Sequence, residues 1–472
     1  MAIRRNLPYS LLLVCVLLLL TACGGSQEEE EENVLIYAAL NPVTRELENE
    51  IGLFNRTHNI QMVIHDYSDE GGVDRLKTEL MLGQVPDIME MQRLGRQDFR
   101  LARDMEVLWY ETIFDADLSD CFWMPYRQMV QKGYLEDLWP YIDNDPLYYR
   151  EKIVEAPLKA AEVDGGLYMI PKYVSVSTLA GPTRVVGDRI GWTLEELIEA
   201  FSTMPSGSKL LRHETTRWDV YINLVAPLLD QYIDWGTGEC SFDNQEFRDT
   251  LEFLSLFPVE DDKRFTGLEL DKENYYLKAD GYRLLEPMSI YQLGTIMNVA
   301  TEFGEPISLV GYPTADGSSG SSFIFHGRPL AMSTSCKDKE AAWDFIRRYL
   351  RPETKSTSGI EHLRRNGVLK IPLNKLEYRL LVMENMEHKY TSWHVLYPSM
   401  DAPLALVPYP TDKDAKNFYE LVDSTTLLYW PENQISDAVW DAIGPYFSGD
   451  KTMEETIDLV QRRVQLYVNE QR

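Results

Sequence analysis

The sequence predicts an α/β protein with two lobes, and two observations support this fold class. Residues 34–91 alternate between short apolar runs and segments with apolar residues at helical spacing, which is typical of a βαβαβ unit around a parallel sheet. The chain has 472 residues and is 44% hydrophobic, so it exceeds the size at which one hydrophobic core stops growing. A second lobe is therefore expected.

The first lobe is expected to begin with three strands, at residues 34–39, 60–67 and 85–91. The first connecting helix is expected to start with Asn41 as its N-cap and Pro42 as its first residue, and Gly83 is expected to close the second helix. Ligands of such sheets bind beyond the carboxyl ends of the strands. The corresponding candidate segments are residues 39–41, 67–69 and 90–92.

Four later helices are predicted from capping residues and apolar spacing, at residues 194–202, 244–256, 339–350 and 453–469. The capping signals read Thr193 to Glu196, Asp243 to Glu246 and Thr452 to Glu455. The run Gly317 to Ser322 is interpreted as a linker loop because it contains only glycine and serine.

The N-terminus has the pattern of an export signal. Arg4 and Arg5 precede an apolar run at residues 11–20, which is shorter than the roughly 18 residues that a membrane-spanning helix needs. The end of this run, Leu20-Thr21-Ala22-Cys23, resembles the lipobox of bacterial lipoproteins, although an ordinary secretory signal with a chance cysteine is the alternative. Residues 1–22 are then a signal peptide, Cys23 the lipidation site, and residues 23–33 a flexible acidic tether.

Composition and motifs argue against several classes of function. A net charge of −29 opposes binding to a phosphate backbone, so no nucleic-acid partner is expected. The five cysteines include no CxxC pair, and residues 213–217 depart from HExxH at the second ligand, so no metal site and no cofactor are predicted. No catalytic residue is predicted, although paired carboxylates of a glycan hydrolase stay possible among 75 acidic residues.

An ordered set of segments resembles the extracellular solute-binding proteins of bacterial ABC importers, group 1, which include sugar-binding lipoproteins. The matching segments span most of the chain: Gln84 to Ile88 (QVPDI), Lys132 to Leu138 (KGYLEDL), Asp164 to Pro171 (DGGLYMIP), Gly191 to Leu197 (GWTLEEL), Ser335 to Phe345 (SCKDKEAAWDF), Lys370 to Pro372 (KIP) and Tyr446 to Asp450 (YFSGD).

The resemblance implies a two-lobe, periplasmic-binding-protein-like fold with a hinge and a ligand cleft between the lobes. It places lobe 1 at residues 34–172 and 311–355, and lobe 2 at residues 173–310 and 356–472. Residues 93–123 depart from the family pattern and are interpreted as an insertion within lobe 1, either a lid or an extra surface subdomain.

Sugar sites combine aromatic rings, which stack on CH faces, with polar groups that bind hydroxyls. The chain has 10 Trp and 27 Tyr, and the expected ligand-binding residues are Asn41, Tyr67, Gln92, Tyr173, Trp218, Trp235, Tyr291 and Tyr312. Trp218 and Trp235 stand beside Asp219 and Asp234, as a stacking ring and a hydrogen-bonding carboxylate do in hexose sites. Packing in the core is the alternative for each tyrosine, and a plain turn is the alternative at Asp234.

The resemblance therefore predicts a monomeric receptor that captures a carbohydrate, expected to be an oligosaccharide, and delivers it to the permease subunits of an ABC transporter. A lipid anchor would hold it on the extracellular or periplasmic face of the cell membrane. Two other functions stay open: a receptor for a non-sugar solute such as a polyamine, and a surface-anchored glycan hydrolase. A role in signalling rather than import is also left open.

Overall fold

The computed structural model describes residues 34–93, 122–211, 216–259, 283–352, 370–387, 409–429 and 433–471. The chain forms two compact units. Unit 1 comprises the described residues up to Glu90 together with Met332–Ile346, and unit 2 comprises the rest. These units do not coincide with the expected lobes, whose boundaries stay a prediction. The signal peptide, Cys23 and the tether lie outside the described residues, as does most of the expected insertion.

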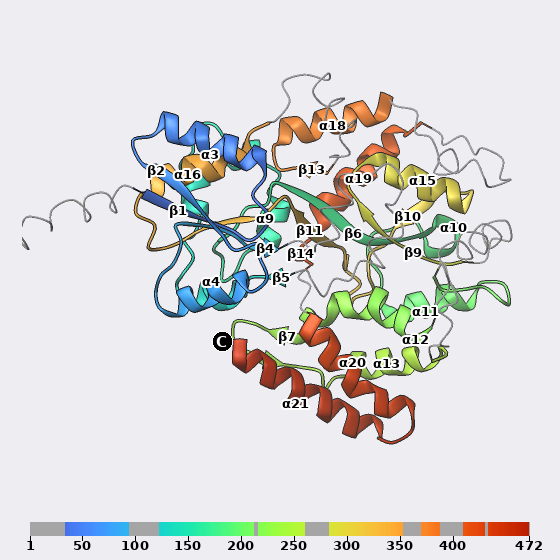
Figure 1. Ribbon diagram of the computed structural model, residues 1–472. Coiled ribbons are helices and arrows are strands. Elements are labelled where there is room, and N and C mark those ends of the chain that lie inside the picture. The colour runs from blue at the N-terminus through green and yellow to red at the C-terminus, as the bar shows by residue number, and fades with distance from the viewer. Residues whose placement is uncertain are drawn as a thin grey trace, which may run out of the picture. The chain divides into compact units, whose positions relative to one another are not determined.

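Unit 1 is the βαβαβ arrangement that the sequence predicts. Its elements are β1 (Val34–Ala39), α3 (Arg45–Thr57), β2 (Gln61–Asp66), α4 (Gly72–Met81) and β3 (Ile88–Glu90), followed by the end of β12 (Leu330–Met332) and by α16 (Lys339–Ile346). The sheet order is β12-β3-β1-β2, and β1 pairs in parallel with both β2 and β3. Figure 1 shows α3 and α4 on opposite faces of this sheet. The chain passes from β1 to β2 on one side and then back across β1 to β3 on the other, and because both crossovers are right-handed their helices lie on opposite faces.

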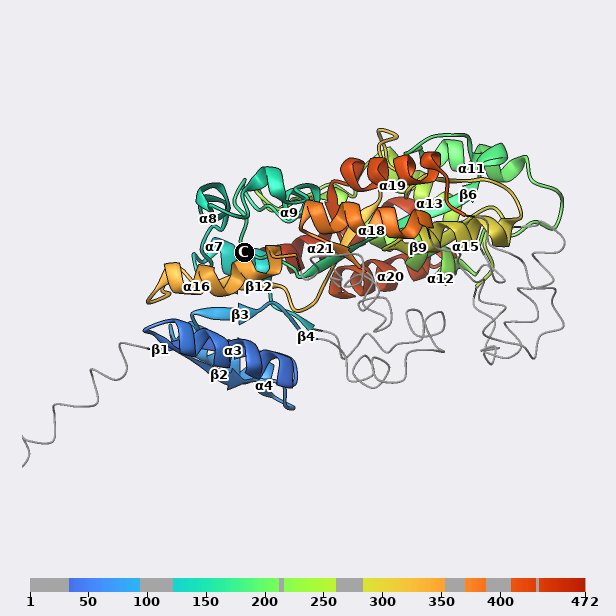
Figure 2. The same ribbon diagram turned by 90° about the horizontal axis from the view of Figure 1, so that it is seen from above.

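Asp87 connects two of the segments that carry the family resemblance. Its carboxylate accepts hydrogen bonds from the backbone N–H of Ile36 at 2.7 Å and from that of Lys337 at 3.0 Å. It thereby ties the start of β1 to the turn before α16. Phe345 of α16 then packs edge-on against Phe54 of α3, with ring centroids 5.9 Å apart, and Figure 2 shows the same elements from above.

The N-cap prediction for α3 is wrong, and the structure gives the reason. Thr44 caps this helix by accepting a hydrogen bond from the Leu47 N–H at 3.3 Å, because the Asn41 side chain is engaged elsewhere. Likewise Asn244, and not Asp243, caps the helix at 245–255 by accepting from the Phe247 N–H at 2.8 Å. The Thr193–Glu196 and Thr452–Glu455 capping pairs are confirmed.

Unit 2 is built around one long strand, β6 (Tyr173–Pro182). The strand order is β10-β6-β11-β14, and β9 and β13 also pair with β6. The strands of the unit are β4 (Gln92–Arg93), β5 (Phe122–Trp123), β6, β7 (Ile233–Asp234), β8 (Glu239–Cys240), β9 (Glu286–Ile290), β10 (Ile307–Leu309), β11 (Ser322–His326), β13 (Ile371–Pro372) and β14 (Leu427–Leu428). The two-stranded pairs β4-β5 and β7-β8 lie outside the main sheet, and β4-β5 closes the base of the expected insertion.

Helices account for the rest of unit 2. They are α7 (Tyr126–Gln131), α8 (Trp139–Asn144), α9 (Ala156–Ala160), α10 (Thr183–Val186), α11 (Leu194–Ser202), α12 (Arg217–Val220), α13 (Gln245–Ser255), α15 (Leu293–Phe303), α18 (Lys375–Glu387), α19 (Asp412–Ser424), α20 (Asn433–Phe447) and α21 (Met453–Gln471), with the π-helix η3 (Tyr221–Val225) and the 3₁₀ segments η2 (Arg150–Lys152), η4 (Ala226–Tyr232) and η5 (Arg347–Leu350). The last two helices pack against each other, and with η4 and α13 they enclose a hydrophobic core.

The Gly/Ser run at residues 317–322 is a packed turn, so its interpretation as a linker is wrong. Ser321 is fully buried, and its hydroxyl lies 2.8 Å from that of Thr178 on β6. A Cβ at Gly191, whose φ is +88°, would lie 2.3 Å from the Gly317 carbonyl oxygen. A Cβ at Gly320 would likewise lie 2.4 Å from the Tyr312 carbonyl oxygen, so glycine is needed where the backbones approach this closely.

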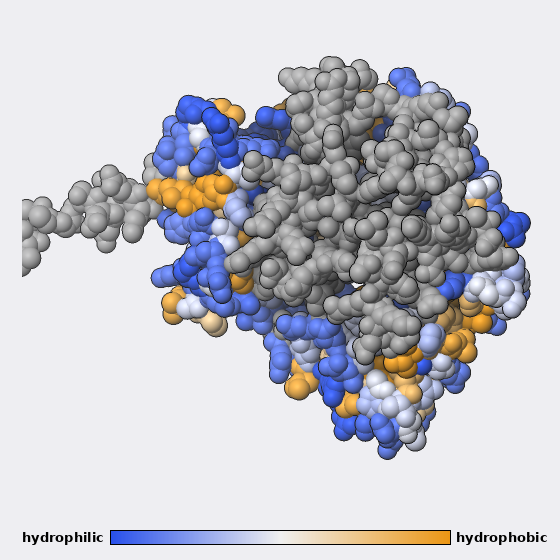
Figure 3. Space-filling model, turned by 45° about the vertical axis from the view of Figure 1, so that its right-hand side comes forward, coloured by the Kyte–Doolittle hydropathy of each residue, from blue (hydrophilic) through white to orange (hydrophobic). Residues whose placement is uncertain are grey.

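The surface of the described residues is mostly hydrophilic, with separate hydrophobic patches, on the face that Figure 3 shows. Within the described ranges, no helix is both long enough and apolar enough to cross a membrane.

Candidate functional site

A pocket of about 240 Å³ lies in unit 2. Four parts of the chain line it: the start of α7, the residues that follow α9, the segment from η4 to the β7-β8 turn, and β14. The lining residues are Tyr126, Arg127, Ala160, Ala161, Glu162, Val163, Pro227, Leu228, Asp230, Gln231, Trp235, Thr426, Leu427 and Leu428. The volume is just below the range of about 300–1,000 Å³ that is typical of pockets for drug-sized ligands.

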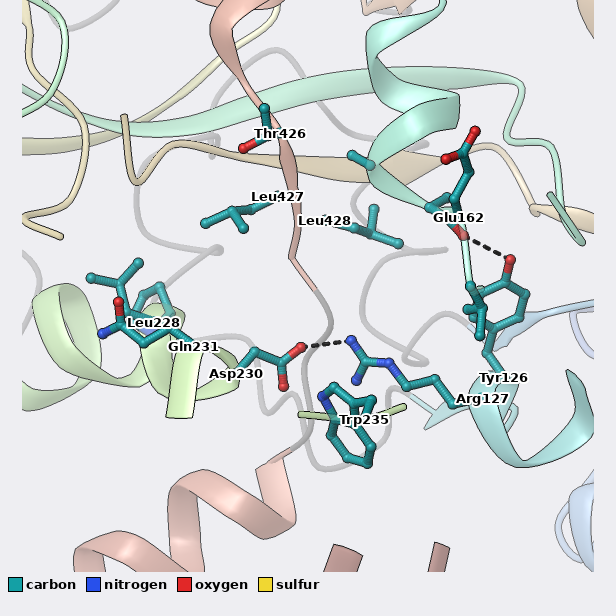
Figure 4. Close-up of a pocket in the computed structure, with 14 residues that line it drawn as sticks. Tyr126, Arg127, Glu162, Leu228, Asp230, Gln231, Trp235, Thr426, Leu427 and Leu428 are labelled. Atoms are coloured by element: carbon teal, nitrogen blue, oxygen red, sulfur yellow. Dashed lines mark hydrogen bonds and ion pairs between the residues drawn. The ribbon is translucent and has the colours of Figure 1, made fainter. Parts of the chain in front are cut away.

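Arg127 and Asp230 form an ion pair in the pocket. Arg127 Nη2 donates to Asp230 Oδ2 at 2.7 Å, and the side chains are 26% and 37% exposed. The Arg127 guanidinium also lies 4.2 Å from the centroid of the Trp235 ring. Figure 4 shows the guanidinium between the Asp230 carboxylate and this ring. Because the pair is partly solvated, its net contribution to stability is at most about 1 kcal/mol. Its main effect is to place a donor and an acceptor beside an aromatic face.

Trp235 reaches the pocket from the turn between β7 and β8. Asp234 shapes this turn, since its Oδ1 accepts hydrogen bonds from the backbone N–H groups of Gly236 at 2.9 Å and Thr237 at 3.1 Å. The turn interpretation of Asp234 is therefore confirmed, although a strand and not a helix follows it. The Trp235 Nε1 atom is buried and has no hydrogen-bond partner among the described residues. A buried indole N–H normally finds an acceptor, so this donor is available to a ligand.

Hydrogen bonds hold the start of α7 in place beside the pocket. The Tyr126 hydroxyl donates to the Ala161 carbonyl at 2.9 Å and accepts from the Tyr168 N–H at 3.3 Å. Burial raises the pKa of Tyr126, so this hydroxyl stays protonated and can donate. Glu162 accepts from Trp139 Nε1 at 2.8 Å. These bonds fix the start of α7, and Arg127 with it, relative to the residues after α9.

Two of the predicted ligand residues lie in unit 1 and are bonded there. Asn41 is fully buried, and its Nδ2 donates to Glu90 Oε2 at 2.8 Å. The Tyr67 hydroxyl donates to Glu79 Oε2 at 2.5 Å, and burial together with Glu79 raises the pKa of this tyrosine. Their role as ligand contacts stays a prediction.

Four other predicted residues lie in unit 2 without lining this pocket. Gln92 is in β4, opposite Trp123 of β5. Tyr173 begins β6, Tyr291 follows β9, and the Tyr312 hydroxyl lies 2.8 Å from that of Ser177. Burial raises the pKa of Tyr291, and that of Tyr312 to about 12. Their ligand contacts also stay predictions.

The two predicted tryptophans have different surroundings. Trp218 packs against Tyr221 and Trp440, with centroids 5.8 and 4.8 Å away, at the margin of the hydrophobic core. Its neighbour Asp219 accepts from the Thr216 N–H at 2.8 Å as part of the α12 cap. Of the eight predicted residues, Trp235 alone lines the pocket.

Sequence reasoning did not identify Arg127, Asp230, Glu162 or the leucines of β14. Arg127 and Asp230 are 103 residues apart, and neither belongs to a segment that carries the family resemblance. Within the described part of the chain, no group of three or more His, Cys, Asp or Glu side chains is placed to hold a metal ion. The cysteines described there, Cys240 and Cys336, are free thiols.

Comparisons with known proteins show similarity of structure and not of sequence. No family model and no curated protein matches the chain. Among solved structures, a periplasmic oligogalacturonide-binding protein from Yersinia enterocolitica is 16% identical, with a TM-score of 0.50, over 93% of this chain and 99% of that one. The sugar-binding protein MalE from Xanthomonas citri is 13% identical, with a TM-score of 0.49, over 93% and 98%. The likeness to the Yersinia protein shows that this chain has the two-lobe α/β fold of a periplasmic binding protein.

Proposed function

We propose that this protein is a solute receptor that binds a carbohydrate and delivers it to the permease of an ABC transporter. The observation that carries this proposal is the Trp235 pocket. Residues 126–163 belong to the segment expected in lobe 1, whereas residues 227–235 and 426–428 belong to segments expected in lobe 2. All of these residues belong to unit 2, so a ligand in this pocket would contact segments of both expected lobes within one compact unit.

The pocket has the chemistry that a sugar needs. Trp235 offers an aromatic face, and Leu228, Leu427 and Leu428 offer apolar walls. Arg127, Asp230 and the Trp235 N–H supply hydrogen-bond donors and an acceptor for hydroxyl groups. A neutral sugar can use all of these groups at once.

The charges in the pocket favour a neutral ligand over a polyamine. The Arg127 guanidinium lies 4.2 Å from the centroid of the Trp235 ring, so a cationic ligand that entered the pocket would meet a like charge. Arg127 and Asp230 neutralise each other, and Glu162 accepts a hydrogen bond from Trp139. A polyamine would therefore bring another cation next to Arg127.

Titration calorimetry with three probes tests this proposal. We expect maltotriose, a neutral oligosaccharide, to give saturable heat, and we expect spermidine to give none. Trigalacturonate, an acidic oligosaccharide, tests whether a ligand carboxylate can replace Asp230 as the ion-pair partner of Arg127. Heat from spermidine alone, or from no oligosaccharide in a wider neutral panel, would contradict the proposal. Chromatography of the probes after several hours detects turnover, which would favour a hydrolase.

We also propose that a lipid on Cys23 holds the receptor at the outer face of the membrane. The supporting observation is the lipobox-like sequence Leu20 to Cys23 before an acidic, glycine-containing tether. Each buried CH₂ of an acyl chain contributes about 0.8 kcal/mol to membrane binding. We expect Cys23→Ala to move the protein from the membrane fraction to the soluble fraction after cell lysis. An unchanged distribution would rule out this anchor.

A further inference from the structure

Two glutamines of α21 bind the backbone of β8, which follows the Trp235 turn. Gln465 accepts from the Cys240 N–H at 3.0 Å and donates to the Gly238 carbonyl at 2.6 Å. Gln461 accepts from the Phe242 N–H at 2.8 Å and donates to the Cys240 carbonyl at 2.6 Å. Side chains of one helix thus bind four backbone groups along one edge of β8 and the residues that flank it.

This arrangement is specific to primary amides. The outer edge of a two-stranded hairpin presents N–H and C=O groups that need partners. A glutamine amide offers both a donor and an acceptor, as a peptide group does, and residues four apart lie on one face of a helix. Gln461 and Gln465 therefore take the place of a third strand beside β8.

The hairpin itself is too short to hold its position alone. β7 and β8 contain two residues each and pair through Ile233 with Cys240 and Asp234 with Glu239. Isolated two-stranded hairpins are marginally stable at best. The helix α21, in contrast, is anchored in the core by Val460 and Val464, which are fully buried. The glutamines therefore connect a firmly packed helix to a weakly held turn.

We propose that Gln461 and Gln465 are positioning residues that set the Trp235 ring in the pocket. The effect of these glutamines on ligand binding rests on the proposed function, whereas their hydrogen bonds to the hairpin do not depend on any ligand. Near its end, α21 also accepts a hydrogen bond from Gln128 of α7 at the Glu470 carbonyl, at 3.4 Å. One helix thus contacts both the Trp235 hairpin and the helix that carries Arg127.

Fluorine NMR on the ligand-free protein, labelled with 5-fluorotryptophan, tests the proposal. The chain has 10 Trp, and the signal of Trp235 is the one that Trp235→Phe removes. In the double variant Gln461→Met with Gln465→Met, we expect the Trp235 signal to shift or broaden while the other signals stay. Gln245→Met is the matched control, because Gln245 is exposed on α13 and donates to Asp249 of the same helix.

The outcomes separate positioning from general support of the fold. An unchanged Trp235 signal overturns the proposal, and so does a common change of all signals, which would mean that the glutamines stabilise the whole unit. If the double variant does not fold, Gln461→Glu replaces it, since the carboxylate can still accept from the Phe242 N–H but repels the Cys240 carbonyl instead of donating to it, and this change should move the same signal.

Binding provides a second measurement. We expect the double variant to raise the Kd for maltotriose about tenfold in the wild-type background and to have no further effect when Trp235 is alanine. Equal effects in both backgrounds would show that the glutamines do not act through Trp235. If no oligosaccharide binds, the proposed function fails, whereas the fluorine signal still decides the positioning role.

Discussion

Replacing Trp235 by alanine is expected to weaken maltotriose binding about 30-fold or more. The ring is the aromatic platform of the pocket, and loss of a central aromatic contact typically costs about 2 kcal/mol or more of binding free energy. The change also removes the buried indole N–H, which is a donor that the fold itself leaves unsatisfied. Stability should change less than in a variant of a ring-stacking core residue, because the Trp235 side chain is partly buried at the margin of the core and lies against the partly exposed Arg127.

Trp218→Ala is the matched control for this prediction. Trp218 is also partly buried beside the same core, but its ring packs against Tyr221 and Trp440 and does not line the pocket. We expect this variant to lose stability and to keep its affinity, as measured by thermal unfolding and calorimetry. Equal losses of affinity in both variants would mean that Trp235 acts through the core and that the pocket is not the binding site.

Replacing Glu90 by alanine is expected to destabilise the protein by about 3 kcal/mol or more. Glu90 is fully buried, and its Oε2 accepts from the Leu40 and Asn41 N–H groups, both at 2.9 Å, and from Asn41 Nδ2 at 2.8 Å. Its Oε1 accepts from the Tyr37 hydroxyl at 2.9 Å. Alanine would leave several buried donors unsatisfied, and each such donor costs about 1–3 kcal/mol.

Glu90→Gln should be much milder, at about 1–2 kcal/mol. The amide oxygen can still accept the three N–H donors, and the new NH₂ group can donate to the Tyr37 hydroxyl, which then acts as an acceptor. Glu70→Ala is the control, since Glu70 is an exposed residue of unit 1. Urea unfolding followed by circular dichroism measures all three variants. Equal losses of stability in Glu90→Ala and Glu90→Gln would show that the negative charge of Glu90, and not its hydrogen-bond acceptors, stabilises this part of unit 1.

Local patterns in the sequence predicted the local structure well. The βαβαβ order of unit 1 follows from apolar spacing within each element, and the Thr193–Glu196 capping box needs only four residues. The prediction failed where a distant residue decided the outcome. Asn41 looked like an N-cap, but Glu90, which is 49 residues away, binds its side chain, and Thr44 caps the helix instead.

The pocket depended even more on distant contacts. Trp235 could be proposed because a tryptophan beside an aspartate is a recognisable pair, although Asp234 proved to shape a turn. The fold places the Arg127 guanidinium over the Trp235 ring. It also pairs Arg127 with Asp230, which is 103 residues away in the sequence. Neither apolar spacing nor a short motif carries that information.

The glutamine contacts of α21 determine how the Trp235 hairpin responds to acidity and salt. Ion pairs at a surface weaken as ionic strength rises and break when a partner gains or loses a proton. The four bonds from Gln461 and Gln465 join amides to peptide groups, and neither kind of group titrates or carries a net charge. These four contacts of the Trp235 hairpin therefore do not depend on the acidity or salt of the surrounding medium.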